Sequence, residues 1–343
     1  MNRLWPALLV EPRDASQRRM AWRVMRQFCD PDQLTSEFGM HCDWQWQVAQ
    51  RVVAEDGQAI KLRLAPAAGV GGDAAEQLAC ECVVLFPPGA EGPRAIGKPP
   101  RATACISSQP GCGVGCPFCL TAGLGYRGNL SMEQIVEQVY WAGVVARQRG
   151  RRLRNVVFMG MGEPLHNTDN VLGAIDWLLA SRGFGLSPRH ITVSTAGVPG
   201  QMLRLARHAP GVRLALSLHS AFAQQRRELV PRACGDLQRL QQAIAAVNAL
   251  QPQPVWIEMV LLDQCNDSLE HARELVNFCR GLQVEVNLIP YNAAGAVERF
   301  TPSPRDRRES FAKVLRSAGI RTTLRTSLGG SAKAACGQLT TAE

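Results

Sequence analysis

From residue 101 onward, short apolar runs alternate with amphipathic segments, and this alternation limits the fold more than any other feature of the sequence. Seven runs rich in β-branched residues are expected to form strands: 102–108, 154–160, 190–195, 212–219, 255–262, 284–290 and 320–326. The segments between them are expected to form helices at 131–148, 168–181, 199–208, 235–250, 268–280 and 304–318. Near-continuous apolar strands are typical of a parallel sheet that is covered on both faces.

Six consecutive β-α units indicate an α/β fold of a particular kind. They favour a parallel barrel, or an open version of one, over a short doubly wound sheet. The predicted architecture is therefore a partial (β/α)6 barrel of the TIM type within residues 101–343. In such barrels the functional residues lie on the loops that follow the carboxyl ends of the strands.

Five of these loops are polar and most contain glycine. In chain order they carry three closely spaced cysteines, "MGEPLHN", "STAG", "SLHS" and "IPYN". Because the carboxyl ends of parallel strands meet at one end of a barrel, these loops are expected to converge on a single mouth. This mouth is the predicted active site.

The first hundred residues have a different pattern. A basic helix is expected at 15–28, a hairpin at 52–65 around the turn Asp56-Gly57, and a further strand and turn at 81–89. The glycine- and alanine-rich segment 66–75 reads as a flexible joint. We therefore expect a small accessory domain at 1–75, which contacts RNA if RNA is the substrate, and a connecting strand and turn at 76–100.

The chain carries a formal net charge of +9, and nearly all of its cations are arginines. Arginine binds phosphates in a bidentate manner and stacks on bases, so a polyanionic partner such as RNA is plausible. The alternative is a source proteome that uses arginine where others use lysine. The run "RQRGRRLR" (147–154) is expected at the bottom of the barrel, away from the mouth. The better candidates for RNA phosphate contacts are the arginines on the mouth side: Arg226, Arg227, Arg232, Arg305, Arg307 and Arg308.

No membrane segment is expected. The early apolar run "LWPALLV" is too short for a signal peptide, and no stretch approaches the ~18 apolar residues of a membrane span. The interpretation is a cytoplasmic protein. In that setting its 12 cysteines are metal ligands, catalytic thiols or buried fillers rather than a disulfide framework.

Three cysteines follow the first barrel strand in the spacing C-x-x-x-C-x-x-C, at Cys112, Cys116 and Cys119. Three thiolates hold three irons of a four-iron cluster and leave the fourth iron open to a ligand. Zinc is the alternative, but it normally takes a fourth Cys or His close by. Three unliganded cysteines in a turn are the third interpretation. Glycines at 111, 113 and 115 allow the backbone to wrap closely around a cluster.

The triplet resembles the signature of radical S-adenosylmethionine (SAM) enzymes. Over roughly residues 79 to 339, the chain is similar to the RlmN/Cfr family of radical SAM RNA adenine methyltransferases, with motifs in the same order. The motifs that carry the resemblance are "CISSQPGCGVGCPFC", "NVVFMGMGEPLHN", "GFGLSPRHITVSTAG", "LALSLHSA", "VPRACG", "IEMVLLDQCND", "VNLIPYN" and the terminal "AACGQL".

The resemblance implies roles for particular residues of this chain. Cys112, Cys116 and Cys119 correspond to the ligands of a 4Fe-4S cluster. Cys336 corresponds to the methyl-carrying cysteine, Cys105 to the resolving cysteine, and Glu81 to a proton acceptor. The SAM contacts correspond to Gly162, Glu163, Ser194, Ser217, Leu218, His219 and Asn292.

The resemblance also implies a mechanism. Carbon 2 and carbon 8 of adenine are not nucleophiles, so the family uses covalent catalysis. One SAM methylates Cys336, and a radical generated from a second takes hydrogen from that S-methyl group. The resulting carbon radical adds to the base, and a proton is removed from the ring. Attack of Cys105 on the Cys336 sulfur then releases the product with a transient disulfide.

The implied activity is methylation of an adenine ring carbon, carbon 2 in preference to carbon 8, in ribosomal or transfer RNA. The implied partners are this RNA and an electron donor such as flavodoxin or ferredoxin, and the protein is expected to be a monomer. Two alternatives belong to other functional classes. One is a radical activase that acts on a protein, and the other is a non-catalytic iron-sulfur or zinc RNA-binding module.

Overall fold

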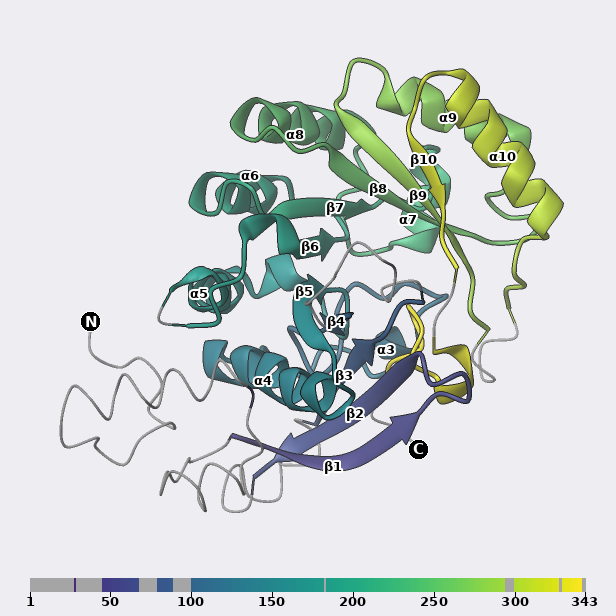
Figure 1. Ribbon diagram of the computed structural model, residues 1–343. Helices are drawn as coiled ribbons and strands as arrows, with labels where there is room; N and C mark the ends of the chain where they lie inside the picture. The colour runs from purple at the N-terminus through teal and green to yellow at the C-terminus, as the bar shows by residue number, and fades with distance from the viewer. Residues whose placement is uncertain are drawn as a thin grey trace, which may run out of the picture.

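The computed structural model describes residue 28 and residues 45–67, 79–88, 100–181, 183–293, 299–326 and 329–340. The described strands form one ten-stranded sheet, in which each strand pairs with the next along the chain from β1 to β10. Figure 1 shows this sheet curving around a central space without closing into a full cylinder.

The parallel part of the sheet runs from β4 to β10 and matches the predicted strands. Its members are β4 (Arg101–Cys105), β5 (Arg152–Phe158), β6 (Ile191–Thr195), β7 (Arg213–Ser217), β8 (Val255–Leu261), β9 (Val284–Pro290) and β10 (Thr322–Leu324). Each overlaps its predicted run. The predicted fold class, a partial α/β barrel, is therefore confirmed, and β10 is a short strand within the last predicted run, 320–326.

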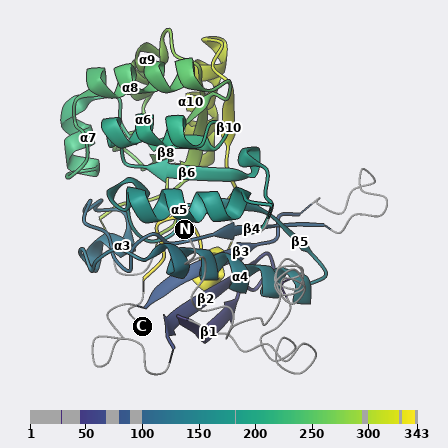
Figure 2. The ribbon, with the colours of Figure 1, turned by 90° about the vertical axis from the view of Figure 1, so that its left-hand side faces the viewer.

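The helices between these strands lie on the convex side of the sheet, as Figures 1 and 2 show. The predicted ones are present as α4 (Met132–Gln148), α5 (Thr168–Leu179), α6 (Pro199–His208), α8 (Leu237–Leu250), α9 (Leu269–Cys279) and α10 (Arg305–Ser317). Two short helices that the sequence did not predict lie in mouth loops: α3 (Leu120–Gly123) and α7 (Ala223–Leu229). None of the described helices is both long enough and apolar enough to span a membrane.

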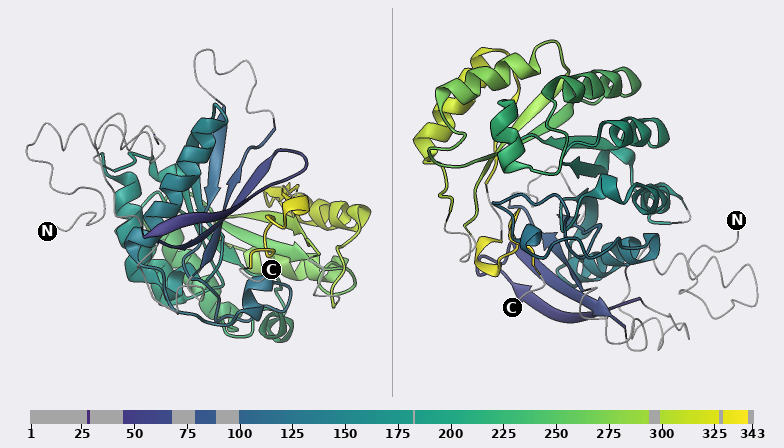
Figure 3. Two further views of the ribbon diagram at one scale, coloured as in Figure 1. Left: turned by 90° about the horizontal axis from the view of Figure 1, so that it is seen from below. Right: turned by 180° about the vertical axis from the view of Figure 1, so that it is seen from behind.

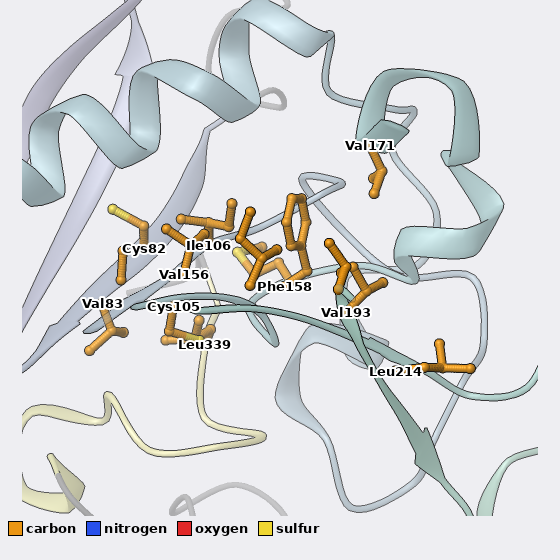
Figure 4. Packing of buried hydrophobic residues seen from close by; sticks show 14 of the residues in the cluster. Cys82, Val83, Cys105, Ile106, Val156, Phe158, Val171, Val193, Leu214 and Leu339 are labelled. Carbon is orange, nitrogen blue, oxygen red and sulfur yellow. The ribbon is translucent and has the colours of Figure 1, made fainter. Parts of the chain in front are cut away.

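The apolar faces of sheet and helices form one continuous core. Ile135 and Val139 of α4 pack in the same buried cluster as Val156 of β5, Val193 of β6 and Leu214 of β7. Figure 4 shows part of this cluster where the strands approach α5. Full burial of each such side chain stabilises the fold by roughly 1.5–3 kcal/mol. The core therefore fixes the strand ends from which the mouth loops depart.

Three N-terminal strands extend the barrel sheet in antiparallel fashion. β1 (Trp46–Val53) and β2 (Ala59–Pro66) form the predicted hairpin, with a turn that contains Gly57. β3 (Cys80–Leu85) pairs with β2 on one side and with β4 on the other. The hairpin is thus hydrogen-bonded into the same sheet as the barrel strands. The predicted helix at 15–28 lies, apart from residue 28, outside the described residues, as does most of the joint at 66–75.

A buried carboxylate attaches this hairpin to the barrel. Glu137 of α4 is fully buried and accepts hydrogen bonds from the backbone N–H groups of Gln45 (2.9 Å) and Trp46 (3.0 Å). The indole Nε1 of Trp46 donates to the carbonyl of Gln134 at 2.9 Å. These contacts satisfy polar groups that would otherwise be buried without partners, so they hold the start of β1 against α4.

The C-terminal segment 329–340 returns to the barrel and lies between β2 and α3, as Figure 1 and both views of Figure 3 show. Several hydrogen bonds anchor it, and three of them lie just after Cys336. Leu120 N donates to Gly337 O (2.9 Å), Thr121 Oγ1 donates to Leu339 O (2.7 Å), and Thr340 N donates to Glu81 Oε2 (2.9 Å). Leu339 is buried in the same apolar cluster as Cys105, and Figure 4 labels both side chains. The anchors fix Cys336, which lies just before them.

The attachment of the hairpin leads to a stability prediction. Substitution Glu137→Ala leaves two buried backbone N–H groups without acceptors, so we expect the free energy of unfolding to fall by about 2–4 kcal/mol. Urea denaturation measures this change. Glu133→Ala, on the same helix, is the control and is expected to change the free energy by about 0.5 kcal/mol or less. Equal losses for the two variants would contradict the attachment.

Candidate active site

The three predicted cluster ligands line one cavity at the mouth of the barrel. Gly115 has a positive φ of 80°, which turns the chain so that the backbone N–H of Cys119 bonds to the carbonyl of Cys116 at 3.1 Å. We call this cavity the upper chamber. Its other lining residues include Gly162, Glu163, Ser194, Ser217, His219, Glu258, Asn292 and Cys336.

The donor set of this loop suits a cluster. Burial raises the pKa of the Cys112 thiol to about 11. Burial also raises the pKa of the Cys116 thiol, and repulsion from the neighbouring Cys119 raises it further. Thiolates at this place therefore need positive charge from a bound metal group. Among the described residues, no group of three or more His, Cys, Asp or Glu side chains is placed to hold a single ion. A four-iron cluster does not require such convergence, because its three cysteines bind three separate irons.

The loop after β5 is built around Gly162. Its φ is +94°, and a Cβ atom there would lie 2.5 Å from Gln109 Cβ, so only glycine is compatible with this packing. Gln109 Oε1 accepts the backbone N–H of Glu163 at 3.0 Å. The buried Glu163 carboxylate accepts the backbone N–H groups of Leu165 (2.9 Å) and Ala196 (2.6 Å). Glu163 thereby joins the loops after β5 and β6, while burial raises its pKa.

His219, in the loop after β7, lines the upper chamber in a strained backbone conformation. Its φ is +59°, a value that residues other than glycine adopt uncommonly and that often marks a functional site. Nδ1 accepts the backbone N–H of Val260 at 3.2 Å, and the ring meets Phe118 edge to face at 4.9 Å. Burial lowers the pKa of His219 to about 3, so the ring is neutral and carries its proton on Nε2.

The other predicted SAM contacts divide into chamber and core positions. Ser194 and Ser217 line the upper chamber, with their hydroxyl oxygens 3.3 Å apart. Asn292 also lines it, and its Nδ2 donates to the carbonyl of Cys336 at 3.4 Å. The Leu218 side chain is fully buried in the apolar core, so only its backbone is available near the loop.

Arg226, predicted to bind RNA phosphate, is instead a fully buried structural residue. Its guanidinium donates to the carbonyls of Ser217 (2.9 Å), Leu218, Ala196 and Cys234 (3.1 Å). Burial lowers its pKa to about 10, so it remains charged at neutral pH. The prediction for Arg226 is therefore wrong, because four carbonyls of the mouth loops surround the guanidinium and exclude solvent.

Three further mouth arginines also have protein partners. The exposed Arg305 forms an ion pair with Glu309 at 2.8 Å on the same helix. Arg232 Nη1 donates to the carbonyl of Gly113 in the cysteine loop at 3.1 Å. Arg307 forms ion pairs with Asp263 (2.9 Å) and Asp267 (3.2 Å). For Arg227, Arg305 and Arg308 the RNA contact stays a prediction.

Cys105 and Cys336, 231 positions apart in the chain, meet below the upper chamber. Both line a second, larger cavity of about 420 Å³, which we call the lower chamber. Cys336 belongs to the linings of both chambers. Burial raises the pKa of Cys105, and the charge of Cys336 raises it further. Cys336 is exposed to these chambers. Desolvation of its thiol nevertheless raises its pKa, and the charge of Glu258 raises it further. The structure thus places on one cavity the two cysteines to which the family resemblance assigns one reaction.

Glu81, the predicted proton acceptor, lies behind the C-terminal segment. It is 3% exposed, and it lines neither chamber. One carboxylate oxygen forms an ion pair with Lys61 at 2.9 Å, and the other accepts the backbone N–H of Thr340 at 2.9 Å. In this structure Oε2 therefore holds the segment that carries Cys336, while Oε1 is held by Lys61 of β2.

Glu258, a buried carboxylate of β8 that lines both chambers, is not among the site residues predicted from the sequence. Asn287 Nδ2 donates to Glu258 Oε1 at 2.9 Å, and the carboxylate contributes to raising the pKa of Cys336. A signal was present, since glutamate is the one charged residue in the apolar run "VWIEMVLL". A charged side chain in a buried strand requires a partner or a function.

The fold and the three-cysteine loop define a radical SAM protein, and residues 106–278 match the family model described as the radical SAM superfamily. Such proteins bind a 4Fe-4S cluster and S-adenosylmethionine. Within this superfamily, the chain belongs to the RlmN family of RNA methyltransferases.

The similarity covers most of the chain. The chain is 44% identical over 244 residues to the dual-specificity RNA methyltransferase RlmN of Syntrophobacter fumaroxidans. The matched region makes up 70% of each protein. The chain is 46% identical over 240 residues to a probable RNA methyltransferase of Rhodopirellula baltica and spans 63% of that protein's length. The crystal structure of a radical SAM methyltransferase from Sphaerobacter thermophilus superimposes with a TM-score of 0.79 at 35% identity, over 91% of this chain and 84% of that one.

The cluster assignment leads to a direct prediction. After anaerobic reconstitution, the wild-type protein is expected to bind about four irons per chain and to show the broad visible absorbance of the cluster. Cys116→Ala is expected to lose both signals, because it removes one of three thiolate ligands. Cys265→Ala, which lies outside the triplet, is the control. Retention of iron and absorbance by Cys116→Ala would refute the assignment.

The buried position of Arg226 gives a second prediction. Arg226→Ala leaves four loop carbonyls without this donor, so we expect a loss of about 3 kcal/mol or more in the free energy of unfolding. The exposed neighbour Arg227 provides a matched control, and Arg227→Ala is expected to have little effect on stability. If the two variants are equally stable in chemical denaturation, Arg226 does not hold the mouth together.

Proposed function

We propose that this protein methylates an adenine ring carbon in RNA, with Cys336 as the carrier of the transferred carbon. The observation that carries the proposal is the position of Cys336, which lines both the upper chamber and the lower chamber that also contains Cys105. The carrier thus faces the cofactor residues on one side and a second cavity on the other. The relatives named as RNA methyltransferases support RNA as the substrate.

Each group has a defined task in this proposal. The cysteine triplet would hold the cluster, and the upper chamber would hold S-adenosylmethionine; together these groups would supply the methyl carbon and the radical that activates it. The neutral His219, with Nε2–H as donor, and the Ser194–Ser217 pair orient the cofactor. Asn292 and the anchors of the C-terminal segment hold Cys336 in place.

The release step uses the two cysteines. The Cys105 thiolate attacks the Cys336 sulfur, so an S–S bond forms while the bond between that sulfur and the transferred carbon breaks. The electron pair leaves with the carbon, which takes a proton and becomes the methyl group. The unpaired electron that radical addition and ring deprotonation leave on the base must pass to a one-electron acceptor, a role that the oxidised cluster held by the cysteine triplet would supply. The disulfide must then be reduced before another turnover. A radical activase or a binding module needs no such cysteine pair.

The finer points of the proposal rest on the family resemblance. They are carbon 2 in preference to carbon 8, a ribosomal or transfer RNA target, a flavodoxin or ferredoxin as electron donor, a monomeric state and a cytoplasmic location. These stay predictions.

The cysteine roles predict opposite phenotypes for two variants. Cys105→Ala cannot release the product, so it is expected to accumulate a covalent adduct with RNA, visible as a ribonuclease-sensitive shift on a denaturing gel. Cys336→Ala is expected to form no adduct, because it has no carrier. Normal turnover by Cys105→Ala would show that the resolving role is wrong.

Glu81 has a separate test. If Glu81 removes the ring proton, Glu81→Gln is expected to stall at the covalent adduct. If its contacts with Lys61 and Thr340 only position Cys336, the variant is expected to form little adduct, and Glu258→Gln becomes the variant that stalls. Gel analysis of both variants in the otherwise wild-type protein distinguishes the two roles.

A further inference from the structure

The lower chamber lies inside the barrel, toward the amino-terminal ends of the parallel strands. Its volume of about 420 Å³ is in the range of small-molecule sites. Thr103, Thr192, Arg213 and Trp256 line it from the first halves of their strands, while residues later in the strands line the upper chamber. Met159, Glu258, Ile289, Asn292 and Cys336 form the boundary that the chambers share.

Two arginines and a tryptophan form one wall of the lower chamber. Arg213 Cζ lies 4.2 Å from the centroid of the Trp256 ring, and Arg325 Cζ lies 5.4 Å from it. Trp256 is fixed from behind, since its Nε1 donates to Glu285 Oε2 at 3.0 Å. We call Arg213, Trp256 and Arg325 the cationic wall.

The cationic wall has unused hydrogen-bonding capacity. The Nε–H of Arg213 is buried and has no partner among the described residues, which is costly unless a ligand supplies an acceptor. Desolvation lowers the pKa of Arg213. The negative charge of Glu285 raises it, whereas the positive charges of Arg325 and Arg321 lower it further. Two cations held at one aromatic ring favour a ligand that is flat and rich in acceptors or negative charge.

Positive charge continues from this wall toward the outside of the barrel. Arg189 and His190 also line the lower chamber, and Arg154 Nε lies 3.2 Å from His190 Nε2. The pKa of His190 is lowered by burial and by four nearby arginines, Arg154, Arg189, Arg101 and Arg152. Arg152 and Arg154 belong to the basic run that the sequence analysis placed far from the mouth. That run does lie at the bottom of the barrel, where it meets the lower chamber.

We propose that the lower chamber binds a single-stranded RNA nucleotide, with its base against the cationic wall below Cys336 and its phosphates toward Arg189 and Arg154. This inference rests on the proposed function and deepens it, because it names the residues that recognise the substrate. Guanidinium planes stack on bases and also bind phosphate, whereas a free inorganic anion would need no aromatic surface. Cys105 and Cys336, at the top of the same chamber, place the reactive sulfurs beside the bound base.

A short oligoadenylate RNA labelled with a fluorophore tests the proposal by anisotropy, without requiring turnover. We expect Arg213→Ala and Arg325→Ala each to weaken binding by about tenfold or more, with a smaller dependence of affinity on salt. Arg213→Lys keeps the charge but loses the planar stacking group, so an intermediate loss is expected. Arg280→Ala, an exposed arginine of another surface, is the control.

Cluster content and reductive cleavage of S-adenosylmethionine are expected to be unchanged in all four variants, which excludes unfolding as the cause. Wild-type affinity in both Arg213→Ala and Arg325→Ala, or no oligoadenylate binding by the wild-type protein, would overturn the inference. The two proposals fail separately. If the wild-type protein methylates RNA but the cationic-wall variants bind oligoadenylate as tightly as it does, only the inference is removed. If those variants bind oligoadenylate more weakly but the wild-type protein methylates no RNA, only the methyltransferase proposal is removed.

Discussion

The hydrogen bonds that hold the C-terminal segment inside the barrel are the constraint on which the site depends. The bonds from Thr340 to Glu81, from Thr121 to Leu339 and from Leu120 to Gly337, together with the Asn292–Cys336 bond, fix Cys336 near the other cysteines. The Thr340–Glu81 bond links residues 259 positions apart. The antiparallel strands at the N-terminus therefore contribute to the site, because β2 and β3 supply the Lys61–Glu81 pair behind the segment.

A second set of buried polar contacts holds the mouth loops in register. Glu163 joins the loops after β5 and β6, and Arg226 joins the loops after β6 and β7. Such networks are costly when incomplete but rigid when every group has a partner. Here they offset the positive φ angles of Gly162 and His219, so the strained loops keep one arrangement around the upper chamber.

Local patterns in the sequence were sufficient for the fold and for the cysteine loop. The strands are apolar runs with clear ends, and the triplet has a spacing that few other sites share, so neither depends on distant contacts. The role of Arg226, in contrast, could not be predicted from its local sequence. It depends on four carbonyls that the fold brings together around the guanidinium. The contact of Glu81 with Thr340 depended equally on tertiary structure. The lower chamber was hidden because its polar residues sit singly within apolar strands, and only the curvature of the sheet gathers them.

These features support the central proposal, that the carbon delivered to adenine passes through the Cys336 sulfur rather than directly from S-adenosylmethionine. The most direct measurement is the mass of the methyladenosine formed in RNA when the protein turns over with S-adenosylmethionine whose methyl group carries three deuterium atoms. Because one deuterium is removed while the carbon is attached to Cys336, the account predicts a product that retains two. A product that retains all three would show direct methyl transfer and contradict the account.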